Sequence, residues 1–197
     1  MTPGIFRILL VEDDPADAGL VERYLGQWPP DVSFELERVD RVGRAHEVIE
    51  RWRPDVLLLD LNLPDSHGLA TVNTMLDQAN GTPIVVMTGE NDDELGIEAV
   101  RLGAQDYLIK DRVDSDSLAR AIQYSIERKR IEEELRDSEE RYALAVTGAN
   151  DGVWDWNLKT DEIYFSERWM TMLGLESEEV PAHVDAWFER VHPDDYV

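Results

Sequence analysis

Charged and hydroxyl side chains follow four separate apolar runs of this sequence, at positions where they could do chemistry together. Glu12 and Asp13 follow the first run, Asp60 ends the third, Thr88 ends the fourth and Lys110 follows the fifth. Carboxylates from two neighbouring runs are the kind of oxygen ligand that Mg²⁺ prefers. A lysine and a hydroxyl group would offset the charge that builds up when a carboxylate attacks a phosphoryl group. Asp60 is the candidate nucleophile, and its product would be an acyl phosphate.

Each of these residues also has an ordinary structural interpretation. Asp13 or Asp14, just before Pro15, could be only the N-cap of a helix. Thr88 alone could be a strand residue of ordinary β-propensity, and Lys110 alone a solvated surface lysine. The combination is much more specific than its members, because an acid pair, a single Asp, a Thr and a Lys occur in order at four predicted strand ends. This combination favours the functional interpretation.

The elements that must position these residues alternate between short apolar runs and amphipathic stretches, from Ile5 to about Val113. This pattern is typical of an α/β fold, a doubly wound parallel sheet of five βα units with helices on both faces. In such a sheet the ligand site lies beyond the carboxyl ends of the strands. The predicted strands are 5–11, 33–39, 55–60, 83–88 and 105–109. The predicted helices are 15–27, 43–52, 68–80, 92–102 and a last one that begins near Ser115.

The last helix is predicted to continue as a long connector, because residues 118–146 contain no Pro or Gly and are rich in good helix formers. Steps of four and three residues give an imperfect heptad seam, made of Tyr124, Arg128, Ile131, Leu135, Ser138, Tyr142 and Ala145. This seam favours a coiled-coil homodimer in which Ile131, Leu135 and Tyr142 make the main contacts. The alternative is an amphipathic helix that packs on its own domain.

The charge of the chain limits its partners. There are 43 acidic and 19 basic residues, which gives a formal net charge of −24, and this field repels nucleic acid and anionic membrane surfaces. No apolar run approaches the length of about 20 residues needed to span a bilayer. We therefore expect no nucleic-acid binding and no membrane insertion. The N-terminus runs directly into acidic residues, unlike a secretory signal, so a cytoplasmic location is expected. The absence of cysteine excludes thiolate chemistry.

Four segments, ILLVEDDPAD, DVLLLDLNLPDSHGL, PIVVMTGE and GAQDYLIK, resemble the receiver domain of response regulators of two-component signalling, in order and spacing. The resemblance covers about residues 6–130. It implies a flavodoxin/receiver-type fold, a sensor histidine kinase or phosphotransfer protein as partner, and Mg²⁺ or Mn²⁺ as cofactor. The only catalysis it implies is self-phosphorylation from small acyl phosphates and autodephosphorylation.

The same resemblance implies a role for each site residue. Asp60 is the implied phosphoacceptor. The implied metal ligands are Glu12, Asp13, Asp60 and, through its backbone carbonyl, Asn62. The implied phosphoryl-binding and switch residues are Thr88, Lys110 and Tyr107, and Glu90 is the implied residue that tunes dephosphorylation. The chain departs from the family where Asp111 follows Lys110, since the family usually has Pro there.

Residues 138–197 resemble the start of a PAS domain, on the segments ERYALAVTGANDGVWDWNLKTDEIYFSERWMTMLGL and WFERVHPDDY. Two short runs, 152–157 and 162–165, are predicted to form a hairpin that is followed by a helix at Ser166. The later strands of this partial α+β segment, and an output domain after them, are expected beyond Val197. No PAS ligand is expected in this fragment, and His183 and His192 are interpreted as surface or cap residues.

We therefore predict three parts: a receiver domain at 1–118, a coiled-coil-like helical linker at 119–147 and the N-terminal portion of a PAS domain at 148–197. The predicted function is to receive a phosphoryl group on Asp60 and relay the change through the linker to the PAS domain and a downstream output. One alternative is a Mg²⁺-dependent aspartyl-phosphate phosphohydrolase, although that enzyme would want a carboxylate at position 62, where the chain has Asn62. The other is a pseudo-receiver scaffold that is not phosphorylated.

Overall fold

The computed structural model describes residues 5–29, 32–89, 92–149, 151–175, 181–188, 190–192 and 194. The chain divides into two compact units, Met1–Glu133 and Glu134–Val197. Helix α5 (Ser115–Ala149) contributes residues to both units.

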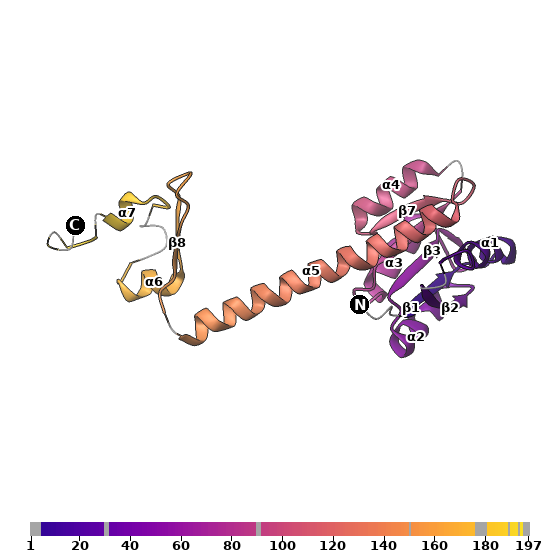
Figure 1. The fold of residues 1–197 in the computed structure, drawn as a ribbon, viewed down its shortest axis with the longest axis horizontal. Helices are drawn as coiled ribbons and strands as arrows, with labels where there is room; N and C mark the ends of the chain where they lie inside the picture. The colour runs from indigo at the N-terminus through magenta and orange to yellow at the C-terminus, as the bar shows by residue number, and fades with distance from the viewer. Residues whose placement is uncertain are drawn as a thin grey trace. The chain divides into compact units, whose positions relative to one another are not determined.

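A five-stranded parallel sheet forms the centre of the first unit (Figure 1). Its spatial order is β2-β1-β3-β6-β7, and every neighbouring pair is parallel. The strands are β1 (Ile5–Val11), β2 (Ser33–Val39), β3 (Val56–Asp60), β6 (Ile84–Thr88) and β7 (Asp106–Ile109). The chain runs from β1 to the edge strand β2, returns past β1 to β3 and then continues to β6 and β7. The sheet therefore grows on both sides of β1, and the prediction of a doubly wound α/β sheet is confirmed.

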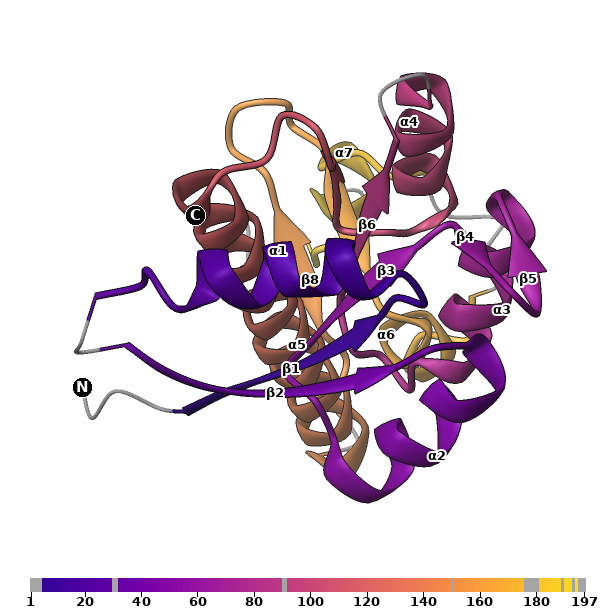
Figure 2. The same cartoon turned by 90° about the vertical axis from the view of Figure 1, so that its right-hand side faces the viewer.

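Helices cover both faces of this sheet, because the central strands bury side chains on both sides. On β3, Leu57 and Leu59 pack on one face with helices α2, α3 and α4. Val56 and Leu58 pack on the other face with α1 and the start of α5. The bounds are α1 (Pro15–Leu25), α2 (Val42–Trp52), α3 (Leu69–Gln78) and α4 (Asp93–Leu102). Figure 2 shows α1 and α2 on opposite sides of β1 and β2. The four apolar side chains of β3 are fully buried, and each such Val or Leu stabilises the fold by about 1.5–3 kcal/mol.

Polar groups attach the start of β3 to β1. The backbone N–H of Asp55 donates to the carbonyl oxygen of Arg7 over 2.8 Å, and a carboxylate oxygen of Asp55 accepts from the backbone N–H of Arg7 over 2.7 Å. The Arg7 guanidinium also donates to the carbonyl oxygen of Trp52, at the end of α2. The first two of these hydrogen bonds join Arg7 and Asp55, the residues directly before the first pair of the β1–β3 register, in which Ile8 lies opposite Val56.

The predicted boundaries of β1 and β2 agree with the observed ones, the other boundaries differ by at most two residues, and one small feature was not predicted. Two strands of two residues each, β4 (Asn62–Leu63) and β5 (Ser66–His67), form a hairpin directly after β3. Asp65, in its turn, accepts hydrogen bonds from the backbone N–H groups of Val42 and Gly43. Helix α2 therefore begins at Val42, one residue before the predicted start, because a distant carboxylate caps it.

Helix α5 is the long helix that the sequence predicts. Its first turn is capped by Asp114, whose carboxylate accepts from the backbone N–H of Ser117 over 2.8 Å. Leu118 and Ile122 are buried against the sheet, and Ile126 is partly buried there. Beyond this region the apolar seam residues Ile131, Leu135 and Tyr142 are exposed. Among the helices of the described residues, none combines the length and apolar character required to cross a bilayer.

The second unit contains an antiparallel hairpin of β8 (Trp154–Trp156) and β9 (Ile163–Phe165), followed by α6 (Glu167–Met172) and α7 (Asp185–Phe188). The predicted hairpin and the helix after Ser166 are therefore present. A small core forms from Ile163, Phe165, Trp169 and Ala186. The hydroxyl of Ser166 caps α6 by accepting from the backbone N–H of Trp169, and it also accepts from that of Val153.

Candidate functional site

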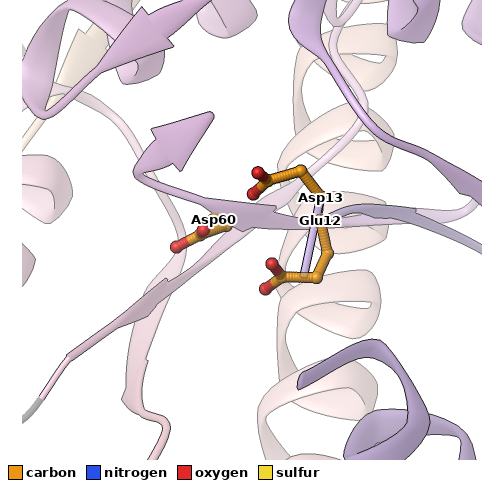
Figure 3. Close-up of side chains that lie close together, drawn as sticks. All are labelled: Glu12, Asp13 and Asp60. Atoms are coloured by element: carbon orange, nitrogen blue, oxygen red, sulfur yellow. The ribbon is translucent and has the colours of Figure 1, made fainter. Parts of the chain in front are cut away.

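Three carboxylates meet at the carboxyl end of the parallel sheet. Glu12 and Asp13 follow β1, and Asp60 is the last residue of β3. One carboxylate oxygen from each of the three lies within 4.8 Å of the other two (Figure 3). Since β1 and β3 are neighbours in the sheet, residues 47 positions or more apart in the chain are brought to one place. Glu12 and Asp60 are buried, whereas Asp13 is partly exposed.

The loop that carries the acid pair is held by its backbone. The N–H of Glu12 donates to the carbonyl oxygen of Val39, and the guanidinium of Arg38 donates to the carbonyl oxygens of Glu12 and Asp13, each over 2.9 Å. The N-cap of α1 is Asp14, which accepts from the backbone N–H of Ala16 over 2.7 Å. Because Asp14 fills the cap, the carboxylate of Asp13 remains available at the cluster.

The ammonium group of Lys110, just after β7, lies among three carboxylates. Its Nζ is 2.7 Å from a carboxylate oxygen of Glu12, 2.7 Å from one of Asp17 and 3.1 Å from one of Asp60. The backbone N–H of Lys110 donates to the carbonyl oxygen of Thr88 over 2.8 Å, which fixes the start of this loop. Asp111 follows Lys110 in this loop, and no cis peptide bond occurs in the part of the chain that the structure describes.

Burial and charge shift the pKa of two groups here. Burial is the main cause that raises the pKa of Glu12, and the negative charge of Asp60 adds to it against the hydrogen bond from Lys110. Burial is also the largest single effect on Lys110, and it lowers the pKa of the ammonium group. The hydrogen bonds to Asp17 and Glu12 and the charge of Asp60 together outweigh burial, so the pKa of Lys110 lies above its ordinary value. Lys110 is therefore a fixed positive charge at neutral pH.

The hydroxyl of Thr88 belongs to β6, the neighbour of β3, and the ring of Tyr107 belongs to β7, the strand beyond it. Thr88 ends β6 and is buried, and within the described residues its hydroxyl oxygen has no hydrogen-bond partner. A buried, unpaired hydroxyl is uncommon in folded proteins, because burying a polar group without a partner is costly. Tyr107 lies on β7, half-buried, with its ring against Gly96 of α4.

A pocket of about 380 Å³ opens at this edge of the sheet. It collects five of the residues that the sequence nominated: Glu12, Asp13, Asp60, Asn62 and Lys110. Thr88 is buried at the adjoining strand end, and neither Thr88 nor Tyr107 is among the described residues that line the pocket. Glu90 lies outside the described residues. Ile131, Leu135 and Tyr142 lie on α5, beyond the part of this helix that is buried against the sheet.

Two residues at the site were not nominated from the sequence. Asp17 lines the pocket and pairs with Lys110, and Arg38 binds the loop of the acid pair. The role of Asp17 could have been predicted from its position, since it lies in the first turn of the helix that begins directly after the acid pair. The role of Arg38 could not have been predicted from the sequence, because it depends on β2 lying beside β1.

The donor set suits a hard divalent cation. Three carboxylates with oxygens within 4.8 Å of one another, on two adjacent strand ends, match the ligand type and the charge that Mg²⁺ requires. Glu12, Asp13 and Asp60 would hold the ion, and Asn62 lines the same pocket. The unpaired hydroxyl of Thr88 adds a donor for an oxygen-rich ligand at the same edge.

A five-stranded, doubly wound parallel sheet with an acidic pocket and a lysine at its carboxyl edge defines the class of receiver proteins. The family model of the response regulator receiver domain matches residues 8–123, and the chain belongs to this family. The first unit is thus a receiver domain of two-component response regulators.

Curated and solved relatives agree with this membership. The chain is 38% identical to the regulatory protein LuxO of Vibrio cholerae over 104 residues, which are 51% of this chain and 21% of LuxO. The signal receiver domain of a putative Luxo repressor protein from Vibrio parahaemolyticus has a TM-score of 0.55 and 27% identity, covering 67% of this chain and 98% of that one. The receiver domain of a sensor histidine kinase from Pseudomonas aeruginosa, solved with a magnesium ion coordinated in its active site cleft, has a TM-score of 0.51 and 27% identity, covering 62% and 98%. The chain spans only about a fifth of the length of LuxO.

Proposed function

We propose that this chain is a phosphoacceptor response regulator, in which Asp60 receives a phosphoryl group from a sensor histidine kinase or a phosphotransfer protein in the cytoplasm. The observation that carries the proposal is the convergence of Glu12, Asp13 and Asp60 on one pocket, with the ammonium of Lys110 3.1 Å from Asp60. Asp60 is positioned as a nucleophile because the buried strand that it ends pairs with β1 on one side and with β6 on the other.

Each proposed group offsets a part of the negative charge that the transfer creates. Lys110 is a permanent cation beside Asp60, and it pairs with the transferred phosphoryl group. The hydroxyl of Thr88, which is buried and unpaired, donates to a phosphoryl oxygen once one is present. Glu12, Asp13, Asp60 and the carbonyl of Asn62 would hold Mg²⁺ or Mn²⁺, which would supply further neutralisation of the phosphoryl oxygens.

The signal then passes to the far part of the chain by a shift between two populated states. Thr88 turns toward the phosphoryl group and Tyr107 follows it, which changes the surface of α4 and α5. We divide the relay into the receiver domain (1–118), the helical linker (119–147) and the PAS-like segment (148–197). The exposure of Ile131, Leu135 and Tyr142 along α5 supports a homodimer through the linker.

The test is phosphorylation by acetyl phosphate in the presence of Mg²⁺, followed by intact mass. The wild-type chain should gain the mass of one phosphoryl group, and removing the metal with a chelator should abolish the gain. Asp60→Asn should not react. Asp77→Asn, which removes an exposed acid from α3, is the matched control and should react like the wild type. The same gain in Asp60→Asn would contradict the assignment, and no gain in the wild type would favour the pseudo-receiver alternative.

The phosphohydrolase alternative has a separate measurement. Such an enzyme would release inorganic phosphate through many turnovers, and its general acid would be a carboxylate two residues after the nucleophile. The side chain at that position is the amide of Asn62, which lines the pocket and cannot transfer a proton in this way. We expect slow phosphate release, limited by loss of the acyl phosphate from Asp60.

A further inference from the structure

Of the three carboxylates that cluster for a metal (Figure 3), that of Asp13 is held least by other groups. The carboxylate of Glu12 accepts from Lys110 and from the backbone N–H of Asp14. The carboxylate of Asp60 lies 3.1 Å from the ammonium of Lys110. Asp13 is partly exposed, and its carboxylate accepts no hydrogen bond from the residues that the structure describes. The place of Asp13 in the cluster therefore depends on its backbone.

Arg38 holds this backbone on both sides of Asp13. Its Nε donates to the carbonyl oxygen of Glu12 and its Nη2 to that of Asp13, each over 2.9 Å. These two carbonyls belong to the peptide groups directly before and directly after the Cα of Asp13. Because a peptide group is planar, holding both groups fixes the direction in which the side chain of Asp13 leaves the chain.

The shape of the guanidinium matters here as well as its charge. Its N–H groups form a rigid, planar fork that reaches two acceptors at once, whereas a lysine ammonium is a point charge on a flexible stem. Arg38 is exposed and makes no ion pair within the described parts of the chain, so the two carbonyls are its partners. Its positive charge alone would repel a cation at the site, whereas its hydrogen bonds would help to form the site. Charge and positioning thus predict effects of opposite sign.

The two common divalent cations differ in how much they need a fixed ligand. Mg²⁺ demands a near-ideal octahedron with oxygens at about 2.0–2.1 Å, whereas Ca²⁺ accepts a flexible shell at about 2.3–2.6 Å. A cluster in which the side chain of Asp13 is fixed in advance therefore favours Mg²⁺. A cluster in which it can move adapts to the larger ion.

We propose that Arg38 is a positioning residue that fixes Asp13 and thereby determines the preference of the acidic site for Mg²⁺ over Ca²⁺. This inference rests on the proposed function, in which the acid pair holds the metal. Since Arg38 is exposed, water can take its place at the two carbonyls, and the fold survives its loss. The loss then falls on metal binding, which must order the loop itself. Without these hydrogen bonds, Mg²⁺ should bind about three- to tenfold more weakly, and Ca²⁺ should lose less.

The experiment titrates the full chain with MgCl₂ and, separately, with CaCl₂, and follows the backbone amide NMR signals of residues 12–14. Arg38→Met removes both hydrogen bonds and keeps a stem of similar length, and it should raise the Mg²⁺ midpoint about three- to tenfold and the Ca²⁺ midpoint less. Arg44→Met is the matched control. Arg44 is 64% exposed and pairs with Asp40, so this variant loses the same charge without touching the loop. Its Mg²⁺ midpoint should stay or fall.

Arg38→Lys separates the fork from the charge. It keeps the positive charge but not the planar pair of donors, so it should also weaken Mg²⁺ binding more than Ca²⁺ binding. Amide hydrogen exchange in β3 checks that every variant is folded, because this strand is buried at each position.

The outcomes distinguish this inference from the function on which it rests. If the wild type binds Mg²⁺ and Arg38→Met binds it equally or more tightly, charge outweighs positioning and the role of Arg38 is refuted. Equal losses for Mg²⁺ and Ca²⁺, or a wild-type midpoint in Arg38→Lys, would also refute it. In each of these cases the phosphoacceptor function of Asp60 stands. If the wild type binds no Mg²⁺ at all, the metal-dependent function fails, and the inference about Arg38 fails with it.

Discussion

Replacing Gly96 by Ala should force the ring of Tyr107 away from helix α4. A Cβ at position 96 would lie 2.3 Å from Cδ2, 2.7 Å from Cγ and 2.8 Å from Cε2 of that ring. Carbon atoms that are not bonded to each other rest about 3.5–4.0 Å apart, so the ring must retreat by more than about 1 Å. Since Tyr107 is the proposed switch aromatic, this substitution acts directly on the contact between α4 and β7.

Two opposing effects set the size of the change. Overpacking costs about 1–3 kcal/mol. Removing a glycine from the interior of a helix returns about 0.5–1 kcal/mol. The free energy of unfolding of the first unit should therefore fall by about 1 kcal/mol, the difference between these effects.

Two further variants isolate the steric effect. Gly96→Ala in a Tyr107→Ala background has no ring to displace, so only the gain of about 0.5–1 kcal/mol in helix propensity remains and the sign reverses. Gly19→Ala in α1 is the matched control, because no atom lies within 4 Å of the added Cβ, and it should stabilise by a similar amount.

The assay must report on the first unit alone. Amide hydrogen exchange in β3 and β6, the most buried strands, measures the unfolding free energy of this unit separately from the second one. An equal loss of stability from Gly96→Ala in the wild-type and Tyr107→Ala backgrounds would refute the reasoning, because the ring would then not be the obstacle.

Three other outcomes are expected. Ser166→Ala removes the oxygen that caps α6, and should cost the second unit about 1 kcal/mol by hydrogen exchange; unchanged protection of α6 would contradict the capping role. The double variant Ile131→Ser, Leu135→Ser replaces two exposed side chains, so it should leave the fold intact yet reduce the mass found by light scattering to that of a monomer; a dimer mass would end the linker proposal. Hydrogen bonds from Ser117 lower the pKa of Asp114, so this carboxylate stabilises the fold at neutral pH and the contribution is lost as the pH falls through that lowered pKa. Asp114→Asn should flatten the acid side of the unfolding profile, and parallel profiles would argue against it.

The sheet could be predicted from the sequence because its central strands are short, apolar and separated by turn residues. Val56–Asp60 and Ile84–Thr88 are buried at every position, as expected for parallel strands covered on both faces. The boundary of α2 could not be predicted in this way, since its cap is Asp65, more than twenty residues further along the chain. The hairpin of β4 and β5 was missed because strands of two residues are too short to show any alternation.

The position of the site could be predicted from topology, but its internal contacts could not. Parallel strands bring their carboxyl ends to one edge, and this alone places Glu12, Asp13 and Asp60 together. The pairing of Lys110 with Asp17 depends on which face of α1 meets the pocket. The hold of Arg38 on the acid loop depends on the reach of one side chain from the neighbouring strand.

The uniform apolar character of the central strands has a consequence for how the chain tolerates insertions and deletions. Every residue of Val56–Leu59 is apolar, so moving β3 by one place would turn each side chain to the opposite layer and still fill both layers with Val and Leu. The apolar residues of β3 therefore do not fix its register in the sheet. The register is fixed by the polar residues at the two ends of the strand. Asp55 accepts a hydrogen bond from Arg7 at one end, and Asp60 pairs with Lys110 at the other. Deleting one residue between Asp55 and Asp60 would preserve the apolar core but displace one of these two aspartates from its contact.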